Sequence, residues 1–175
     1  MGRRDAAPYS YERACSVFLF VVLSIAGCKC SEPKPSADAV RQEDLARLPQ
    51  ASGSMQDQLN VEAGGRPTDT VTFEALSAAL AKDGITFGAS KQTYGKKLLA
   101  HYCATADSTD GMIVTVCEYP SADQAARGQT EGDTINKATA GHQSRLRKKS
   151  VLHLVARSDT PPEHVAKVLS TFEGL

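Results

Sequence analysis

Two largely apolar stretches, 98–106 and 112–119, are joined by Ser108-Thr109-Asp110-Gly111. An Asp-Gly pair between such stretches is typical of the tight turn of a β-hairpin, because glycine readily adopts the positive φ that the turn requires. With a three-residue loop at 109–111, residues that face each other across the hairpin have numbers that add up to 220. This register places Cys103 opposite Cys117. The sequence therefore predicts an antiparallel sheet.

Helix signals lie on both sides of the hairpin. Thr72 is a good N-cap for a helix over about 73–82, and Val71 and Leu76 can form a hydrophobic staple across its start. Gly84 supplies the left-handed residue that ends such a helix. A second capping box at 121–124 predicts a helix after the hairpin, and we expect Gly128 and Gly132 to limit its length.

The C-terminal part of the chain continues the alternation of strands and helices. Residues 145–148 and 151–156 are typical of an edge strand and a buried strand, and a capping box at 160–163 precedes a helix with apolar residues at helical spacing. We expect Gly174 to end this helix. The order predicts an α+β fold over 70–175, a small antiparallel sheet with helices packed on one face.

A different kind of segment stands near the N-terminus. Residues 16–27 form an apolar run of 12 residues, preceded by Arg3, Arg4 and Arg13. As a helix this run would rise about 18 Å, whereas the hydrocarbon core of a bilayer is about 30 Å thick. A basic leader, a short apolar core and a small-residue exit are typical of a secretory signal peptide, here residues 1–27.

The exit of this segment, Ile25-Ala26-Gly27-Cys28, resembles the lipobox of bacterial lipoproteins. The resemblance covers residues 1–28 only. It implies that the Cys28 thiol receives a diacyl (palmitate-type) lipid, that the chain is cleaved before Cys28, and that the new amino terminus is acylated. Several acyl chains on one residue give stable membrane anchoring. By the same resemblance, Lys29 after the cysteine favours the outer membrane, with the protein facing the periplasm.

Residues 28–69 are expected to be the lipidated cysteine and a flexible linker. This segment holds Pro33, Pro35, Pro49 and Pro67 and few apolar residues. Such a composition does not bury enough apolar surface to offset the entropy lost on ordering. A brief helix over 36–48 is the one exception that the pattern allows.

Charge and motifs exclude several function classes. Removal of residues 1–27 leaves 148 residues with 17 basic and 18 acidic side chains. A net charge near −1 provides no field that would collect nucleic acid, so no nucleic-acid partner is expected. No serine-hydrolase or phosphate-binding glycine motif occurs, and we expect no catalytic residue, metal or cofactor. The sequence does not determine an oligomeric state.

The expected compartment predicts the oxidation state of the remaining cysteines. Outside the cytoplasm paired thiols are the norm, so Cys103 and Cys117 are predicted to form a cross-strand disulfide. The competing hypothesis is a redox or metal site, because His101 would share one face of the hairpin with the two cysteines. A fourth metal ligand is not evident. For Cys30 two alternatives stay open, a cross-link to a second copy and a free thiol.

These observations predict a membrane-anchored envelope lipoprotein whose domain 70–175 is a non-catalytic binding or scaffolding module. Its partner would be another envelope protein or a small ligand, held near the membrane through the lipid on Cys28. The alternative is a small envelope enzyme or metal-binding protein that uses the neighbourhood of Cys103, Cys117 and His101. The histidines lie outside any known metal-binding motif, and His153, in the middle of an apolar strand, is expected to be a core or half-buried residue with one hydrogen bond rather than a base.

Overall fold

The computed structural model describes residues 35–175, so the expectations about the signal peptide, Cys28 and Cys30 lie outside the described residues. The described part contains five α-helices, one 3₁₀ helix and five strands. In chain order these are α1 (Ala37–Arg47), α2 (Met55–Gly64), α3 (Phe73–Ala81), β1 (Lys91–Thr93), η1 (Gly95–Leu98), β2 (Tyr102–Asp107), β3 (Met112–Glu118), α4 (Ala122–Ile135), β4 (His142–Arg147), β5 (Ser150–Ala156) and α5 (Pro162–Gly174).

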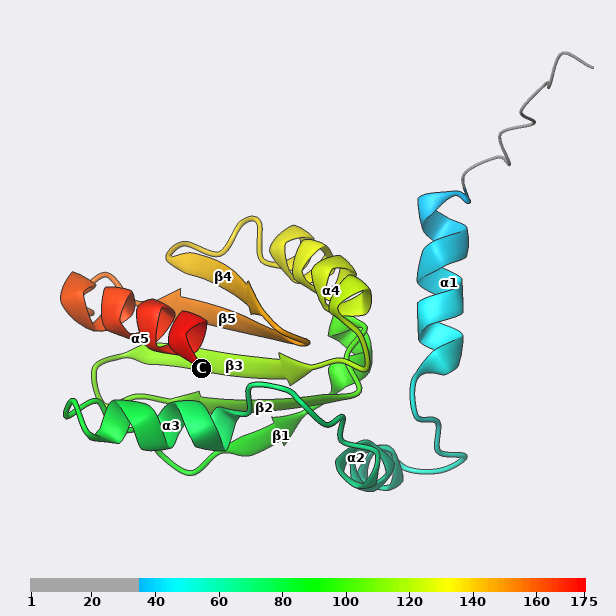
Figure 1. Ribbon diagram of the computed structural model, residues 1–175, viewed down its shortest axis with the longest axis horizontal. Coiled ribbons are helices and arrows are strands. Elements are labelled where there is room, and N and C mark those ends of the chain that lie inside the picture. The colour runs from blue at the N-terminus through cyan, green and yellow to red at the C-terminus, as the bar shows by residue number, and fades with distance from the viewer. Residues whose placement is uncertain (1–34) are drawn as a thin grey trace, which may run out of the picture. The chain divides into compact units, whose positions relative to one another are not determined.

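The strands form one antiparallel sheet in the order β1-β2-β3-β5-β4 (Figure 1), which confirms the α+β class. The hairpin of β2 and β3 has the predicted register, in which Cys103 is opposite Cys117. Gly111 closes its turn with φ of 84°, the left-handed conformation that the Asp-Gly signal predicts. β4 is an edge strand, as its basic residues indicate.

One face of the sheet carries the larger core. Figure 1 shows α3 and α5 side by side over this face. Thr72 caps α3 as predicted, and its hydroxyl accepts a hydrogen bond from the backbone N–H of Ala75. The fully buried members of this core are Leu76, Leu80, Ile85, Met112, Val114, Val116, Leu152, Leu154, Val168 and Phe172.

The expected packing of helices on one face holds for α3 and α5, whereas α4 packs on the opposite face. There it covers the smaller cluster of Cys103, Cys117, Tyr119, Ala125 and Val151. The prediction that the two glycines limit this helix was wrong, because α4 continues through both to Ile135. A Cβ atom at Gly128 would overlap the ring of Tyr119, and one at Gly132 would overlap His153. The glycines bring α4 close to the sheet.

The expected flexible linker is also wrong for much of the described residues: α1 matches the brief helix that the pattern allowed over 36–48, but α2 was not expected. Polar contacts hold them. The carboxylate of Asp44, 1% exposed, accepts hydrogen bonds from Arg127 of α4 at 2.5 and 2.7 Å. Glu62, also 1% exposed, accepts from the backbone N–H of Gly95 at 3.2 Å. Such contacts stabilise helices that have almost no apolar face.

Two further boundaries differ from expectation. The first strand of the hairpin was expected from residue 98, but Leu98 belongs to η1 and β2 begins at Tyr102. β1, which was not predicted, pairs with β2. Thr160 does not cap α5. Its hydroxyl instead donates to the backbone oxygen of Asp110 at 3.1 Å, and Pro161 occupies the N-cap position. This bond ties the start of α5 to the turn of the central hairpin.

Candidate functional site

The predicted disulfide between Cys103 and Cys117 is present, with the two Cα atoms 4.1 Å apart. Both residues are fully buried under α4. The bond therefore links the two strands of the hairpin inside the smaller core, which is the structural role that the register predicts.

The hypothesis of a redox or metal site at His101, Cys103 and Cys117 does not fit this geometry. In the disulfide neither sulfur is a thiolate that could bind a metal, and both cysteines are fully buried, so no thiol of a second molecule reaches the bond. Burial lowers the pKa of His101, against a smaller opposing effect of a backbone hydrogen bond at Gly65. Its Nε2 atom is buried and has no hydrogen-bond partner among residues 35–175.

A row of polar side chains crosses the α4 face of the sheet. Thr105, Thr115, His153 and Ser144 are consecutive cross-strand partners on β2, β3, β5 and β4. The hydroxyls of Thr105 and Thr115 are 2.8 Å apart, and Thr93 on β1 extends the row to Thr105 at 3.2 Å. On β2, β3 and β5 the residues that face the other side of the sheet, such as Ala104, Val114 and Leu154, are apolar and belong to the larger core. The polar row therefore belongs to the α4 face alone.

α4 covers only part of this face, and the uncovered part is hollowed. A cleft of about 390 Å³ lies there, a size typical of small-molecule sites. We call it the threonine cleft. Its lining combines hydroxyl, apolar, imidazole and amine groups: Thr93, Tyr94, Lys97, Leu98, Thr105, Ile113, Thr115, Ile135, Asn136, His142, His153 and Val155. Ile113 and Ile135 are 44% and 55% exposed, which is unusual for isoleucine.

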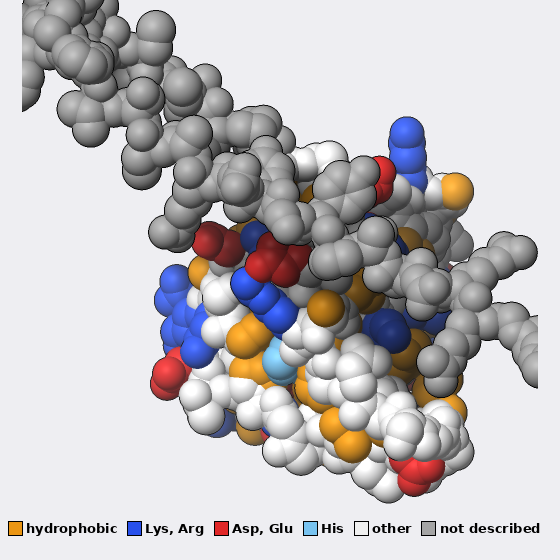
Figure 2. Space-filling model, turned by 90° about the vertical axis from the view of Figure 1, so that its right-hand side faces the viewer, with side chains coloured by type: hydrophobic (Ala, Val, Ile, Leu, Met, Phe, Trp, Pro, Cys, Tyr) orange, Lys and Arg blue, Asp and Glu red, His pale blue; other side chains and the backbone are white. Residues whose placement is uncertain are grey.

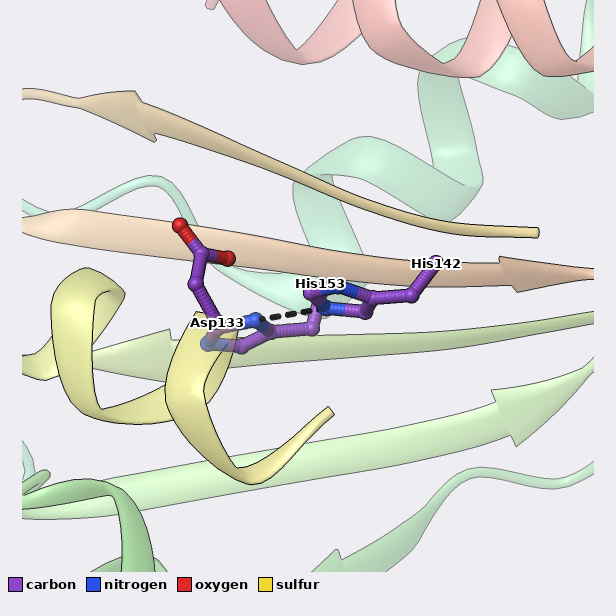
Figure 3. Close-up of side chains that lie close together, drawn as sticks. All are labelled: Asp133, His142 and His153. Carbon is purple, nitrogen blue, oxygen red and sulfur yellow. Dashed lines mark hydrogen bonds between the residues drawn. The ribbon is translucent and has the colours of Figure 1, made fainter. Parts of the chain in front are cut away.

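Two histidines and an aspartate converge at the side of the threonine cleft. His142 is on β4, His153 on β5 and Asp133 on the last turns of α4 (Figure 3). Nε2 of His142 lies 3.4 Å from Nδ1 of His153, and the two rings are nearly parallel, at 18°. One nitrogen or carboxylate oxygen from each residue lies within 4.8 Å of the other two.

The electrostatics of this cluster keep His153 neutral. His153 is 5% exposed, and burial is the main cause that lowers its pKa to about 4. The charge of His142 lowers the pKa further, and that of Asp133 acts in the opposite direction. At neutral pH the imidazole therefore offers a nitrogen lone pair, which is the form that binds metals or accepts protons. The predicted burial of His153 is confirmed.

Two of the four basic residues of 145–149, at the sheet edge, form ion pairs, and Lys148 donates to the backbone oxygen of Leu175. Arg145 contacts Glu173 at 3.0 Å and Lys149 contacts Asp69 at 3.8 Å. The contacts of Arg145 and Lys149 fit a solvated strand edge. Figure 2 shows that basic and acidic side chains also lie next to one another on the face that it presents.

The sequence did not reveal the cluster of Asp133, His142 and His153, although it contained two signals. His153 and Thr115 are polar, whereas the residues two positions before and after each of them, which point to the same face of the strand, are apolar. Gly128 and Gly132, four residues apart, indicate a helix that lies very close to its support. Only the fold shows that this support includes His153.

Comparisons with known proteins found no relative of this chain. No protein-family model matches the chain, and no curated protein sequence or solved structure matches it. Within residues 35–175, no helix is long and apolar enough to cross a membrane.

Proposed function

We propose that this chain is a lipid-anchored protein of the bacterial cell envelope that binds a small amphipathic molecule in the threonine cleft. The anchoring half of the proposal rests on the lipobox at Ile25–Cys28. A buried disulfide between Cys103 and Cys117 supports an oxidising compartment, because such bonds are rare in the cytosol. The outer membrane, facing the periplasm, is the proposed location.

The observation that carries the binding half is the composition of the threonine cleft. Apolar side chains such as Ile113 and Ile135 provide contact area for the body of a ligand, and the hydroxyls of Thr105 and Thr115 provide polar contacts along the floor. Lys97 is exposed and provides a positive charge for an anionic end. This pattern of apolar walls with few polar groups is typical of small-ligand sites. The cleft favours a small ligand over a protein partner.

Binding can be tested with indole-3-acetate, an aromatic anion whose indole fluorescence is visible because the chain contains no Trp. We expect its fluorescence anisotropy to rise saturably with full-length protein in detergent. Ile113→Asp should weaken binding at least about tenfold, a loss of about 1.4 kcal/mol. Leu146→Asp is the matched control, since Leu146 is a similarly exposed apolar residue of the sheet, at 38%, that does not line the cleft.

A second pair of variants tests whether Lys97 binds the anionic end of the ligand. Lys97→Gln should weaken binding of indole-3-acetate, whereas Lys91→Gln, an exposed lysine of β1 outside the cleft, should not. Non-saturable binding, or equal losses in variants and controls, would overturn the ligand proposal.

Anchoring is tested separately by metabolic labelling with an alkynyl palmitate. We expect label on the wild-type chain and none on Cys28→Ala. A wild-type chain of full length without lipid would contradict the anchor while leaving the binding result unaffected.

A further inference from the structure

His153 lacks the contacts that normally hold a buried histidine. Its only polar contact with the described residues is the 3.4 Å approach to His142, and its Nε2 atom is buried without a partner. The nitrogens of a buried histidine are as a rule held by a backbone group, a carboxylate or water. Nδ1 of His153 instead faces only the imidazole nitrogen of His142, and an ion placed between the two rings would satisfy both atoms. The partnerless Nε2 lies against Gly132 of α4 and is not part of that site.

The spacing of the cluster matches a coordination sphere. In tetrahedral zinc sites with metal–nitrogen bonds of 2.0–2.1 Å, neighbouring ligand atoms are about 3.3 Å apart. Nε2 of His142 and Nδ1 of His153 are 3.4 Å apart. The carboxylate of Asp133, within 4.8 Å, belongs to an exposed side chain on α4 that can approach by rotation about its side-chain torsions.

The scaffold of the cluster supports this function. His142 and His153 belong to two strands paired in a fixed register, so their backbone positions are determined by the β4–β5 ladder. Asp133 directly follows Gly132, whose missing Cβ allows α4 to lie against the His153 ring. Three separate elements thus hold the donors in place, which limits the reorganisation that binding would require.

From this geometry we propose that Asp133, His142 and His153 bind a late first-row divalent transition metal such as Zn²⁺. Two imidazoles and one carboxylate suit such ions, whereas Mg²⁺ and Ca²⁺ prefer sets of oxygen ligands. Three protein ligands leave a coordination position open. Since His142 and His153 also line the threonine cleft, that open position is available to water or to an oxygen of a ligand in the cleft. Metal binding does not depend on the proposed ligand or on the lipid anchor.

The test is calorimetric titration of tag-free, metal-stripped full-length protein with Zn²⁺. We expect one ion per chain with a Kd below about 100 μM. His142→Gln and Asp133→Asn should each weaken binding at least about tenfold, since loss of even an outer-shell partner costs about 10- to 100-fold. Both side chains lie at the surface or half-buried, so these variants should fold.

Two controls match these variants. His164→Gln removes a histidine from another His–Asp pair, His164 and Asp110 at 2.8 Å. Asp123→Asn removes an exposed carboxylate from the first turn of the same helix. Both should bind Zn²⁺ like the wild type.

Co²⁺ gives a readout of the donor atoms. We expect visible absorption bands without the near-ultraviolet sulfur-to-metal band that cysteine ligands produce. Absence of binding at 100 μM Zn²⁺, equal losses in variants and controls, or a thiolate band with Co²⁺ would overturn the proposal.

Discussion

Arg127 of α4 donates two hydrogen bonds, at 2.5 and 2.7 Å, to the buried carboxylate of Asp44 on α1. The two residues are 83 positions apart in the chain. This bidentate pair joins an N-terminal helix of low hydrophobicity to the helix that covers the sheet. Removal of one partner from a buried ion pair lowers the stability of the folded state by about 3–5 kcal/mol.

The first prediction concerns this pair. Arg127→Met should release α1 from α4 rather than unfold the domain, because undocking α1 returns Asp44 to water and avoids the penalty of an unpaired buried charge. We expect faster hydrogen exchange at the backbone amides of 37–47 and unchanged exchange in β3 and β5. Arg41→Met is the control, since its partner Glu131 is more exposed than Asp44. Equal exchange in α1 of wild type and Arg127→Met would contradict the prediction.

The second prediction concerns the disulfide. Cys103→Ala with Cys117→Ala opens a loop of about 15 residues, which in the chain-entropy model lowers stability by about 3 kcal/mol. For a domain of this size the melting temperature should fall by about 10 °C. Differential scanning calorimetry measures this change, and reducing agent should not lower the melting temperature of the double variant further. A shift of less than about 1 °C would show that the bond contributes little.

Features set by neighbouring residues were predictable from the sequence. The turn at 109–111 determines its own register, and that register alone pairs Cys103 with Cys117. The cap at Thr72 and the terminator Gly84 likewise act within the segment that they delimit. The β2–β3 hairpin and α3 therefore matched expectation closely.

Features held by distant polar contacts were not predictable in this way. α1 and α2 have few apolar residues, and the buried Asp44 and Glu62 depend on Arg127 and Gly95. Periodicity analysis detects apolar faces only, so it indicated a linker. The cluster of Asp133, His142 and His153 was not predicted for the same reason, because its members come together only when α4, β4 and β5 pack.

The third prediction concerns the glycine that brings α4 to the sheet. Gly132→Ala places a methyl group into the His153 ring, and overpacking of this kind costs about 1–3 kcal/mol. Gly64→Ala in α2 is the control, because a Cβ there meets nothing within 4 Å. It should be neutral or stabilising by up to about 1 kcal/mol, the gain in helix propensity. Urea denaturation compares the two, and a Gly132→Ala variant as stable as Gly64→Ala would contradict the contact.

The last prediction concerns pH and the metal-free protein. Burial lowers the pKa of His153 from 6.5 to about 4, so between these values the unfolded chain binds a proton that the folded chain does not. The free energy of unfolding therefore decreases as the pH falls from 6.5 towards 4. One such group contributes a loss of about 2 kcal/mol between pH 7.5 and pH 5.

Urea denaturation with a chelator present, at pH 7.5 and pH 5, measures this loss. His153→Gln is expected to be less stable at pH 7.5 but to lose less stability on acidification than the wild type. Some dependence should persist in the variant, because burial also lowers the pKa of His101. His142 and Asp133 face the same ring with opposite effects on its pKa, so Asp133→Asn should lower the pKa of His153 further and extend the loss to lower pH. Equal losses in wild type and His153→Gln would mean that His153 takes up its proton in the folded state, and that its burial does not govern the response to acid.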